Sequence, residues 1–311
     1  MQSTMQNSAL TIRAIFEHGE RVYPHSEVIT FDGTTTRHAT FTEVARRARQ
    51  LAAALIRLGV KPGERVGTFC WNCQEHLEAY FAVPCIGAVL HTLNIRLFPE
   101  QIGYVINHAE DSVIIVDATL LPILEPILPR LSTVRRLIVI GDAAVNLPIG
   151  WTRYEETLSR ENAEIQLPEI DECSAAAMCY TSGTTGNPKG VVYSHRSVWL
   201  HSQAIVSASC FAITEHDRAL VSPSMFHANA WGIPHAGWFV GADLIMPNRY
   251  LQAEPLSRLI ALERPTFAGA VPTIWSDLVR HAETHPVDLS SFRLAISGGS
   301  AQSCPSAFAP G

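Results

Sequence analysis

Short apolar segments with the character of β-strands alternate with helix-like segments along most of this chain, and this alternation constrains its fold more than any other feature. The expected strands cover residues 65–70, 89–94, 112–116, 175–179, 191–193, 219–221, 242–246, 266–268 and 293–297. The expected helices cover residues 40–59, 75–88, 99–110, 196–210, 255–262 and 272–284. Strands that alternate with helices form parallel sheets with helices on both faces. We therefore predict an α/β fold with mainly parallel sheets.

The chain length and one irregular stretch predict the domain organisation. At 311 residues the chain is long enough for more than one folding unit. Residues 146–173 are rich in proline and acidic residues, and we interpret this stretch as a connection. The prediction is two α/β subdomains, at about residues 1–170 and 171–311.

Composition and charge exclude several classes of protein. The net charge is −6 and no block of lysine or arginine stands out, which argues against nucleic acid or an anionic membrane as a partner. The longest apolar run, residues 81–90, contains Pro84 and is too short to span a bilayer. Residues 1–10 lack the apolar core of a signal peptide, and seven scattered cysteines indicate reduced thiols. We expect a cytoplasmic protein without a transmembrane segment.

The stretch Tyr-Thr-Ser-Gly-Thr-Thr-Gly-Asn-Pro-Lys-Gly at residues 180–190 carries the strongest chemical signal. It combines four serine or threonine residues, three glycines and one lysine between two expected strands. Glycines let a backbone approach a ligand closely, hydroxyls donate hydrogen bonds, and a lysine adds a positive charge. The spacing differs from a Walker A loop. A flexible surface loop is the alternative, but the density of hydroxyls and the flanking strands favour a loop that holds a polyphosphate.

Three further segments follow expected strands, where α/β proteins place ligand contacts. Residues 222–232 contain His227 and Trp231, and these two side chains could equally fill the core. Residues 269–273 and 297–301 each read, on their own, as a tight turn. An imidazole can bind a carboxylate or a phosphate, and an indole can act as a bulky apolar door.

The loop at 180–190 closely resembles the signature of the adenylate-forming, or AMP-binding, superfamily, which includes acyl-CoA synthetases, luciferases and the adenylation domains of peptide synthetases. Residues 77–84, 87–94 and 104–111 look like the corresponding segments of long- and medium-chain fatty-acid–CoA ligases. The resemblance covers roughly residues 10–302 and implies the N-terminal, AMP-binding domain of such an enzyme.

The resemblance also implies roles for individual residues. The nucleotide-binding residues would be Thr181, Ser182, Gly183, Thr184, Thr185, Gly186, Lys189, Gly298, Gly299, Ser300 and Ala301. The acyl-binding residues would be His227, Trp231, Gly269, Val271 and Pro272, with Trp231 as the gate of an acyl tunnel. His227 and Lys189 would take part in catalysis, and Thr184 would contact a magnesium ion.

The implied function is a fatty-acid–CoA ligase that uses ATP, Mg²⁺ and CoA. The acid attacks the α-phosphate of ATP to give acyl-AMP and pyrophosphate, and the thiol of CoA then takes the acyl group. An aryl or short-chain acid CoA ligase is the alternative within the superfamily, and a non-catalytic ATP-binding remnant is the alternative outside it. The family's Tyr-Gly-x-Thr-Glu segment, ribose-binding Asp and C-terminal domain have no counterpart here, so we expect a truncated, inactive chain. A homodimer is expected by analogy alone.

Overall fold

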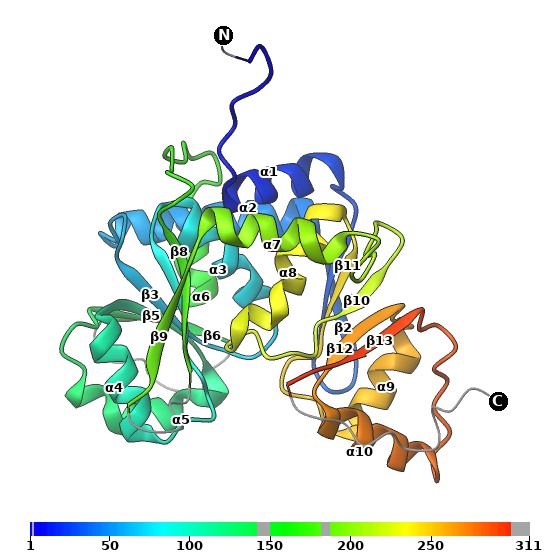
Figure 1. The fold of residues 1–311 in the computed structure, drawn as a ribbon. Coiled ribbons are helices and arrows are strands. Elements are labelled where there is room, and N and C mark those ends of the chain that lie inside the picture. The colour runs from blue at the N-terminus through cyan, green and yellow to red at the C-terminus, as the bar shows by residue number, and fades with distance from the viewer. Residues whose placement is uncertain (2, 142–149, 182–186, 300–311) are drawn as a thin grey trace.

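Two β-sheets with helices packed around them form the structure, a computed structural model that describes residues 1, 3–141, 150–181 and 187–299. One sheet has seven strands in the order β7-β6-β5-β3-β4-β8-β9, and the other has six in the order β13-β12-β10-β11-β1-β2. Figure 1 shows the sheets side by side, with α1, α2 and α7 across the top and α3 and α8 between them. The predicted α/β fold with mainly parallel sheets is confirmed.

The seven-stranded sheet is parallel except for its last pair. Its strands are β3 (Arg65–Phe69), β4 (Val89–Thr92), β5 (Asp111–Asp117), β6 (Arg136–Ile140), β7 (Trp151–Arg153), β8 (Ala175–Thr181) and β9 (Lys189–Ser194). β5 lies inside the sheet and is almost entirely buried, as its run of Val and Ile requires. β8 and β9 form an antiparallel pair at one edge.

The six-stranded sheet is parallel except for β1 and β2. Its strands are β1 (Glu27–Phe31), β2 (Thr36–Thr40), β10 (Arg218–Leu220), β11 (Asp243–Met246), β12 (Phe267–Ala270) and β13 (Leu294–Ser297). β1 pairs in parallel with β11, which lies about 215 residues later, with Val28 opposite Leu244. Each sheet therefore contains strands from before and from after residue 170. The predicted division into subdomains at about residues 1–170 and 171–311 stays a prediction.

The helices begin and end close to the expected positions, with local reasons visible in the structure. They are α1 (Ile12–Val22), α2 (Phe41–Arg57), α3 (Gln74–Cys85), α4 (Pro99–Ala109), α5 (Leu121–Leu124), α6 (Tyr154–Ser159), α7 (His195–Val206), α8 (Ile233–Val240), α9 (Ala253–Glu263) and α10 (Pro272–Ala282). Short 3-10 turns are η1 (Ala118–Leu120), η2 (Glu125–Arg130) and η3 (Ala228–Gly232). At the start of α2, Thr40 and Glu43 form a capping box, in which each side chain accepts a hydrogen bond from the other residue's backbone N–H.

An aromatic cluster joins four helices in the core between the sheets. The Trp238 ring of α8 stacks on Phe41 of α2 with ring centroids 4.0 Å apart, and it also contacts Phe16 of α1 and Phe81 of α3. Its indole nitrogen donates to the Phe16 carbonyl at 3.0 Å. Such rings bury large apolar areas, so this cluster holds the N-terminal helices against the second half of the chain.

Some predicted elements differ from the structure in extent, and other elements of the structure had not been predicted. The stretch 146–173 contains β7 and α6, so it is not a plain connection. The predicted helix 196–210 ends at Val206. The helices α1, α5, α6 and α8 and the strands β1, β2, β6 and β7 had not been predicted. β2 has no apolar run because none of its five residues is buried, and all are exposed or half-buried in the structure.

No helix within the described ranges has the length and apolar character that crossing a membrane requires. Cys70 and Cys73 are buried free thiols, and burial raises the pKa of both far above the ordinary value.

Candidate functional site

The β8–β9 pair carries the ends of the predicted phosphate loop. Thr181, the last residue of β8, lies opposite Lys189, the first residue of β9, and both are exposed. The Thr181 hydroxyl donates to the Lys189 carbonyl at 3.5 Å. Ser182, Gly183, Thr184, Thr185 and Gly186 lie outside the described residues, so the phosphate and magnesium contacts assigned to them stay predictions.

A hydrogen bond fixes the strand that leads into this loop. The Tyr180 hydroxyl and Nδ1 of His108 on α4 share a hydrogen bond of 2.6 Å, and the centroid of the Tyr180 ring lies 5.2 Å from that of the His91 ring. His91 in turn contacts the Asp111 carboxylate at 2.8 Å. The strand before the loop is therefore attached to α4 as well as to its neighbouring strands.

The side chain of Asn72, which the sequence reading did not single out, holds the segment before His227. Its amide nitrogen donates to the carbonyls of Val221 and Pro223 at 2.7 and 2.8 Å, and its amide oxygen accepts from Met225 N at 2.9 Å. Asn72 follows the carboxyl end of β3, in the other sheet. This position after a strand was the one sequence feature that could have indicated a role for Asn72, because polar residues just after parallel strands face ligands or other loops.

Two more side chains of the seven-stranded half support the same segment. The Tyr80 hydroxyl donates to the Met225 carbonyl, and the Thr92 hydroxyl donates to the Phe226 carbonyl at 3.3 Å. We call residues 221–226 the tethered segment, because its backbone is held by side chains from β3–α3, α3 and β4. His227, which follows it, has an exposed side chain.

Directly after His227 the backbone makes a left-handed turn, which comprises residues 228–232. Its φ angles are 44° at Ala228, 48° at Asn229, 51° at Ala230, 56° at Trp231 and 75° at Gly232. Left-handed backbone costs an L-residue other than glycine roughly 1–2 kcal/mol. Such strain persists only where the surroundings impose it, and it is concentrated at functional sites.

The left-handed turn directs Trp231 toward two of the predicted glycines. A Cβ on Gly269 would lie 3.1 Å from Cζ3 of the Trp231 indole, and a Cβ on Gly298 would lie 3.2 Å from its Cη2. The structure thus brings Trp231 together with Gly269 and Gly298, at the carboxyl ends of β12 and β13. Only glycine leaves room for the ring at these two positions without a shift of the neighbouring atoms.

The remaining predicted residues lie around the same strand ends. Val271 is 36% exposed and precedes α10, and Pro272 is buried at the first position of that helix. Gly299 has a φ of 93°, and a Cβ there would lie 3.5 Å from Val271 Cγ1. Ser300 and Ala301 lie outside the described residues.

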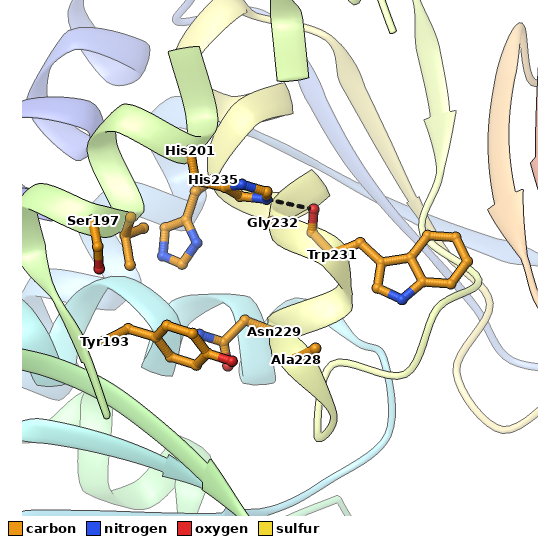
Figure 2. A pocket seen from close by; sticks show the side chains of 9 residues that line it. Tyr193, Ser197, His201, Ala228, Asn229, Trp231, Gly232 and His235 are labelled. Carbon is orange, nitrogen blue, oxygen red and sulfur yellow. Dashed lines mark hydrogen bonds between the residues drawn. The ribbon is translucent and has the colours of Figure 1, made fainter. Parts of the chain in front are cut away.

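A cavity of about 480 Å³ opens on the other side of the left-handed turn. Its lining residues come from β9, α7, the turn and α8: Tyr193, Ser197, Val198, His201, Ala228, Asn229, Trp231, Gly232 and His235. In Figure 2 the Trp231 indole points away from Tyr193 and Ser197, while its carbonyl oxygen faces His201 Nε2 at 3.1 Å. The volume lies in the usual range for small-molecule pockets.

The described residues hold no group of three or more His, Cys, Asp or Glu side chains that could bind a metal ion. The one predicted metal contact, Thr184, lies outside them.

Comparison with known proteins identifies the family. A family profile described as AMP-binding enzyme matches residues 16–306. The chain is 42% identical, over 96% of its length, to a long-chain-fatty-acid–CoA ligase of Thermus thermophilus, and 40% identical, over 98%, to a medium-chain-fatty-acid–CoA ligase of Ectopseudomonas oleovorans. It is also 40% identical, over 98%, to a 3-methylmercaptopropionyl-CoA ligase of Ruegeria lacuscaerulensis. It spans 54–57% of the length of these relatives.

Solved structures agree with this family. The anthranilate CoA ligase AuaEII, in complex with anthranoyl-AMP, has a TM-score of 0.87 and 25% identity, and the match covers 97% of this chain and 57% of that one. The N-terminal domain of FACL13 from Mycobacterium tuberculosis has a TM-score of 0.80 and 27% identity, and the match covers 96% of this chain and 71% of that one. The chain therefore belongs to the AMP-binding enzyme family, as its loop at residues 180–190 predicts.

Proposed function

We propose that this chain forms the ATP- and acid-binding part of a fatty-acid–CoA ligase, whose substrates are a fatty acid, ATP and CoA. The observation that carries the proposal is the arrangement around Trp231. Its indole lies against Gly269 and Gly298, and its backbone lines the cavity of about 480 Å³. The names of two relatives, 40% and 42% identical, support a fatty acid, whereas a third relative, also 40% identical, is named for 3-methylmercaptopropionate.

Lys189 and His227, whose side chains are both exposed, have distinct roles in this proposal. Lys189 contributes a positive charge to the β- and γ-phosphates of ATP, together with the hydroxyl of Thr181. His227, at the end of the tethered segment, is placed to hydrogen-bond the acid carboxylate as it approaches the α-phosphate. Magnesium bridging the phosphates would reduce their negative charge, and its contact at Thr184 is part of the proposal.

Binding of an acid series tests the proposed substrate class. Each methylene that enters an apolar cavity contributes about 0.8 kcal/mol, which is close to a fourfold gain in affinity. Straight-chain acids of increasing length should therefore bind progressively more tightly, as titration calorimetry can measure. Tighter binding of benzoate or acetate than of any longer acid would instead favour the aryl or short-chain alternative, to which the anthranilate ligase structure lends some support.

The nucleotide role is tested separately. Lys189→Ala should weaken ATP binding by about tenfold, since it removes a charged hydrogen bond to phosphate. Lys61→Ala serves as the control, because Lys61 is exposed and lies in the turn before β3, far along the chain from the loop. Equal ATP affinity in both variants would contradict the proposal.

Turnover distinguishes an enzyme from a binding protein. Pyrophosphate release from ATP and palmitate measures whether the 311-residue chain catalyses the first step. That this chain is inactive stays a prediction. ATP binding without any acid binding would favour the non-catalytic alternative.

A further inference from the structure

The end of the β8–β9 pair that carries Thr181 and Lys189 has little support from the sheet. β9 is the outermost strand of the seven-stranded sheet, and among the described strands only β8 pairs with it. The first four residues of β9, 189–192, are all exposed. A strand with few buried contacts opens locally more easily than a strand inside a sheet. The position of the Lys189 side chain therefore depends on contacts that β8 supplies.

Tyr180 of β8 supports both strands at this end. It precedes Thr181 in the chain, and across the pair it lies opposite Gly190, the residue after Lys189. The Tyr180 ring covers that glycine, since a Cβ on Gly190 would lie 3.3 Å from Tyr180 Cζ. An aromatic ring over a cross-strand glycine fixes the pairing and restricts the glycine backbone. The place of the Tyr180 ring thus sets the place of the backbone next to Lys189.

His108, near the C-terminal end of α4, holds the outer end of the Tyr180 side chain. In Figure 1, α4 lies beside the lower end of the β8–β9 pair. The 2.6 Å hydrogen bond joins Nδ1 of His108 to the Tyr180 hydroxyl, and the two rings meet edge to face with centroids 5.8 Å apart. The Tyr104 ring stacks on His108 at 5.3 Å, which limits the motion of the imidazole. Burial raises the pKa of Tyr180 to about 12, so its hydroxyl keeps its proton at physiological pH.

Buried groups hold the rest of the Tyr180 ring. Tyr180 is 4% exposed, and its ring packs against His91, whose Nδ1 lies 2.8 Å from the Asp111 carboxylate. His91 and Asp111 are both buried, whereas His108 is exposed. The bond to His108 is therefore the contact of Tyr180 that a substitution can remove without opening the core.

We propose that His108 is a positioning residue for the phosphate site, which acts through Tyr180 on the backbone that carries Lys189. The path has two contacts, one from the imidazole to the Tyr180 hydroxyl and one from the Tyr180 ring to Gly190. The inference rests on the proposed function, because it assumes that Lys189 binds the phosphates of ATP. A residue that acts only through Lys189 cannot weaken ATP binding more than removal of the Lys189 side chain does, for which we expect about tenfold.

ATP binding to the 311-residue chain tests the proposal. His108→Ala removes one hydrogen bond and should weaken ATP binding about fivefold by titration calorimetry. His108→Asn keeps a hydrogen-bonding group near the position of Nδ1 and should restore the affinity to within about twofold. His285→Ala is the matched control and should leave the affinity unchanged. His285 is also exposed, stacks on another ring, that of His281, and hydrogen-bonds a hydroxyl, that of Thr284, but it follows α10 in the other half of the molecule.

Double variants distinguish positioning of Lys189 from a general structural effect. In a chain that already carries Lys189→Ala, His108→Ala should weaken ATP binding less than about twofold, because its effect passes through the missing side chain. Tyr180→Phe removes the hydroxyl but keeps a ring over Gly190, so it should weaken ATP binding as much as His108→Ala does. The two substitutions together should then weaken it no more than either alone.

Each result decides for or against the inference. A fivefold loss that Asn rescues and that disappears without Lys189 supports it. Unchanged ATP affinity in His108→Ala overturns the inference alone, and so does an equal fivefold loss in the Lys189→Ala chain. If His108→Ala fails to fold, Tyr180→Phe with and without Lys189→Ala gives the same decision. If the unaltered chain does not bind ATP, the inference and the proposed nucleotide site both fail.

Discussion

The tethered segment and the left-handed turn are adjacent in sequence, yet they are held in opposite ways. Residues 221–226 have relaxed backbone and are fastened by the side chains of Asn72, Tyr80 and Thr92 from the other sheet. Residues 228–231 have left-handed φ angles that strain an L-residue, and Gly232 ends the turn with a φ of 75°, which glycine adopts without strain. His227 lies at the junction. The comparison teaches that the site combines two kinds of segment. Side chains of the other sheet hold the tethered segment in place, whereas the left-handed turn keeps a backbone conformation that is unfavourable by itself.

The largest expected effect comes from releasing the tether. Asn72→Ala leaves two buried carbonyls and one buried N–H without partners, which should lower the free energy of unfolding by about 4 kcal/mol. Asn94→Ala is the control, because its exposed oxygen accepts only from Arg96 N, and it should cost less than about 1 kcal/mol. Urea unfolding measures both, and similar losses would show that the tether is no stronger than a surface cap.

Acid should affect the two halves through different histidines. His76 beside the tether hydrogen-bonds Thr68 and Trp71, whereas the His235 ring after the turn packs against the rings of Tyr80 and Phe81, and burial lowers the pKa of each histidine to about 4. Because both folded-state values lie below the ordinary 6.5, the stability present above pH 6.5 is lost as the pH falls toward 4. His235→Phe should reduce this loss by up to roughly 3 kcal/mol in urea unfolding at pH 7 and pH 4.

His76→Phe should behave differently at neutral pH, because it also breaks two hydrogen bonds. His216→Phe is the control, because it makes the same substitution at a side chain that is 88% exposed. If His235→Phe is as acid-sensitive as the unaltered chain, the assignment of the acid effect to this ring is wrong.

The end of the turn offers a test of steric strain. Gly232 has a φ of 75°, and a Cβ there would lie 2.4 Å from Cδ2 of His201. Gly232→Ala should cost about 2 kcal/mol, from the left-handed backbone and from the contact together. Gly59→Ala isolates the backbone part, because Gly59 has a φ of 82° and open space around it. Thermal unfolding should show a larger loss of stability for Gly232→Ala than for Gly59→Ala. Equal losses would mean that the close contact with His201 costs nothing.

The smallest effect is a difference between two buried alanines. Ala230→Gly and Ala268→Gly each remove a buried methyl group and add freedom to the unfolded chain. Only Ala230 has a left-handed backbone, with a φ of 51°, so glycine relieves strain there and its substitution should cost about 1–2 kcal/mol less than that of Ala268 in β12. Chemical denaturation of the pair measures this difference. Equal losses of stability would mean that the turn is not strained at Ala230.

The strand–helix alternation predicted the fold class and most elements because buried parallel strands and amphipathic helices leave strong local patterns. Pairings between distant segments leave none. Nothing near Val28 signals that it will lie opposite Leu244, and nothing near Asn72 signals that its amide will serve Val221 and Met225. The left-handed turn was equally hidden, since Ala, Asn, Ala and Trp precede its one glycine.

Among the site residues, the family resemblance put Trp231 and Gly269 in the acyl-binding set and Gly298 in the nucleotide-binding set, and the structure brings these three together. The burial of His235 was not predicted. His235 lies in an apolar helix, and only the packing of its ring against Tyr80 and Phe81 of α3 reveals that it is buried. Local sequence does not encode such burial, because it depends on which distant segment packs on the helix.

The parallel pairing of β1 with β11 sets an order on events during synthesis. When Glu27–Phe31 leaves the ribosome, its partner at Asp243–Met246 has not been made, and an isolated hairpin of β1 with β2 is marginally stable in water. The inner edge of β1, with its buried Val28 and Ile29, therefore stays open to other chains through some 200 further residues of translation. The nascent chain is therefore most exposed to strand pairing with other chains during that interval.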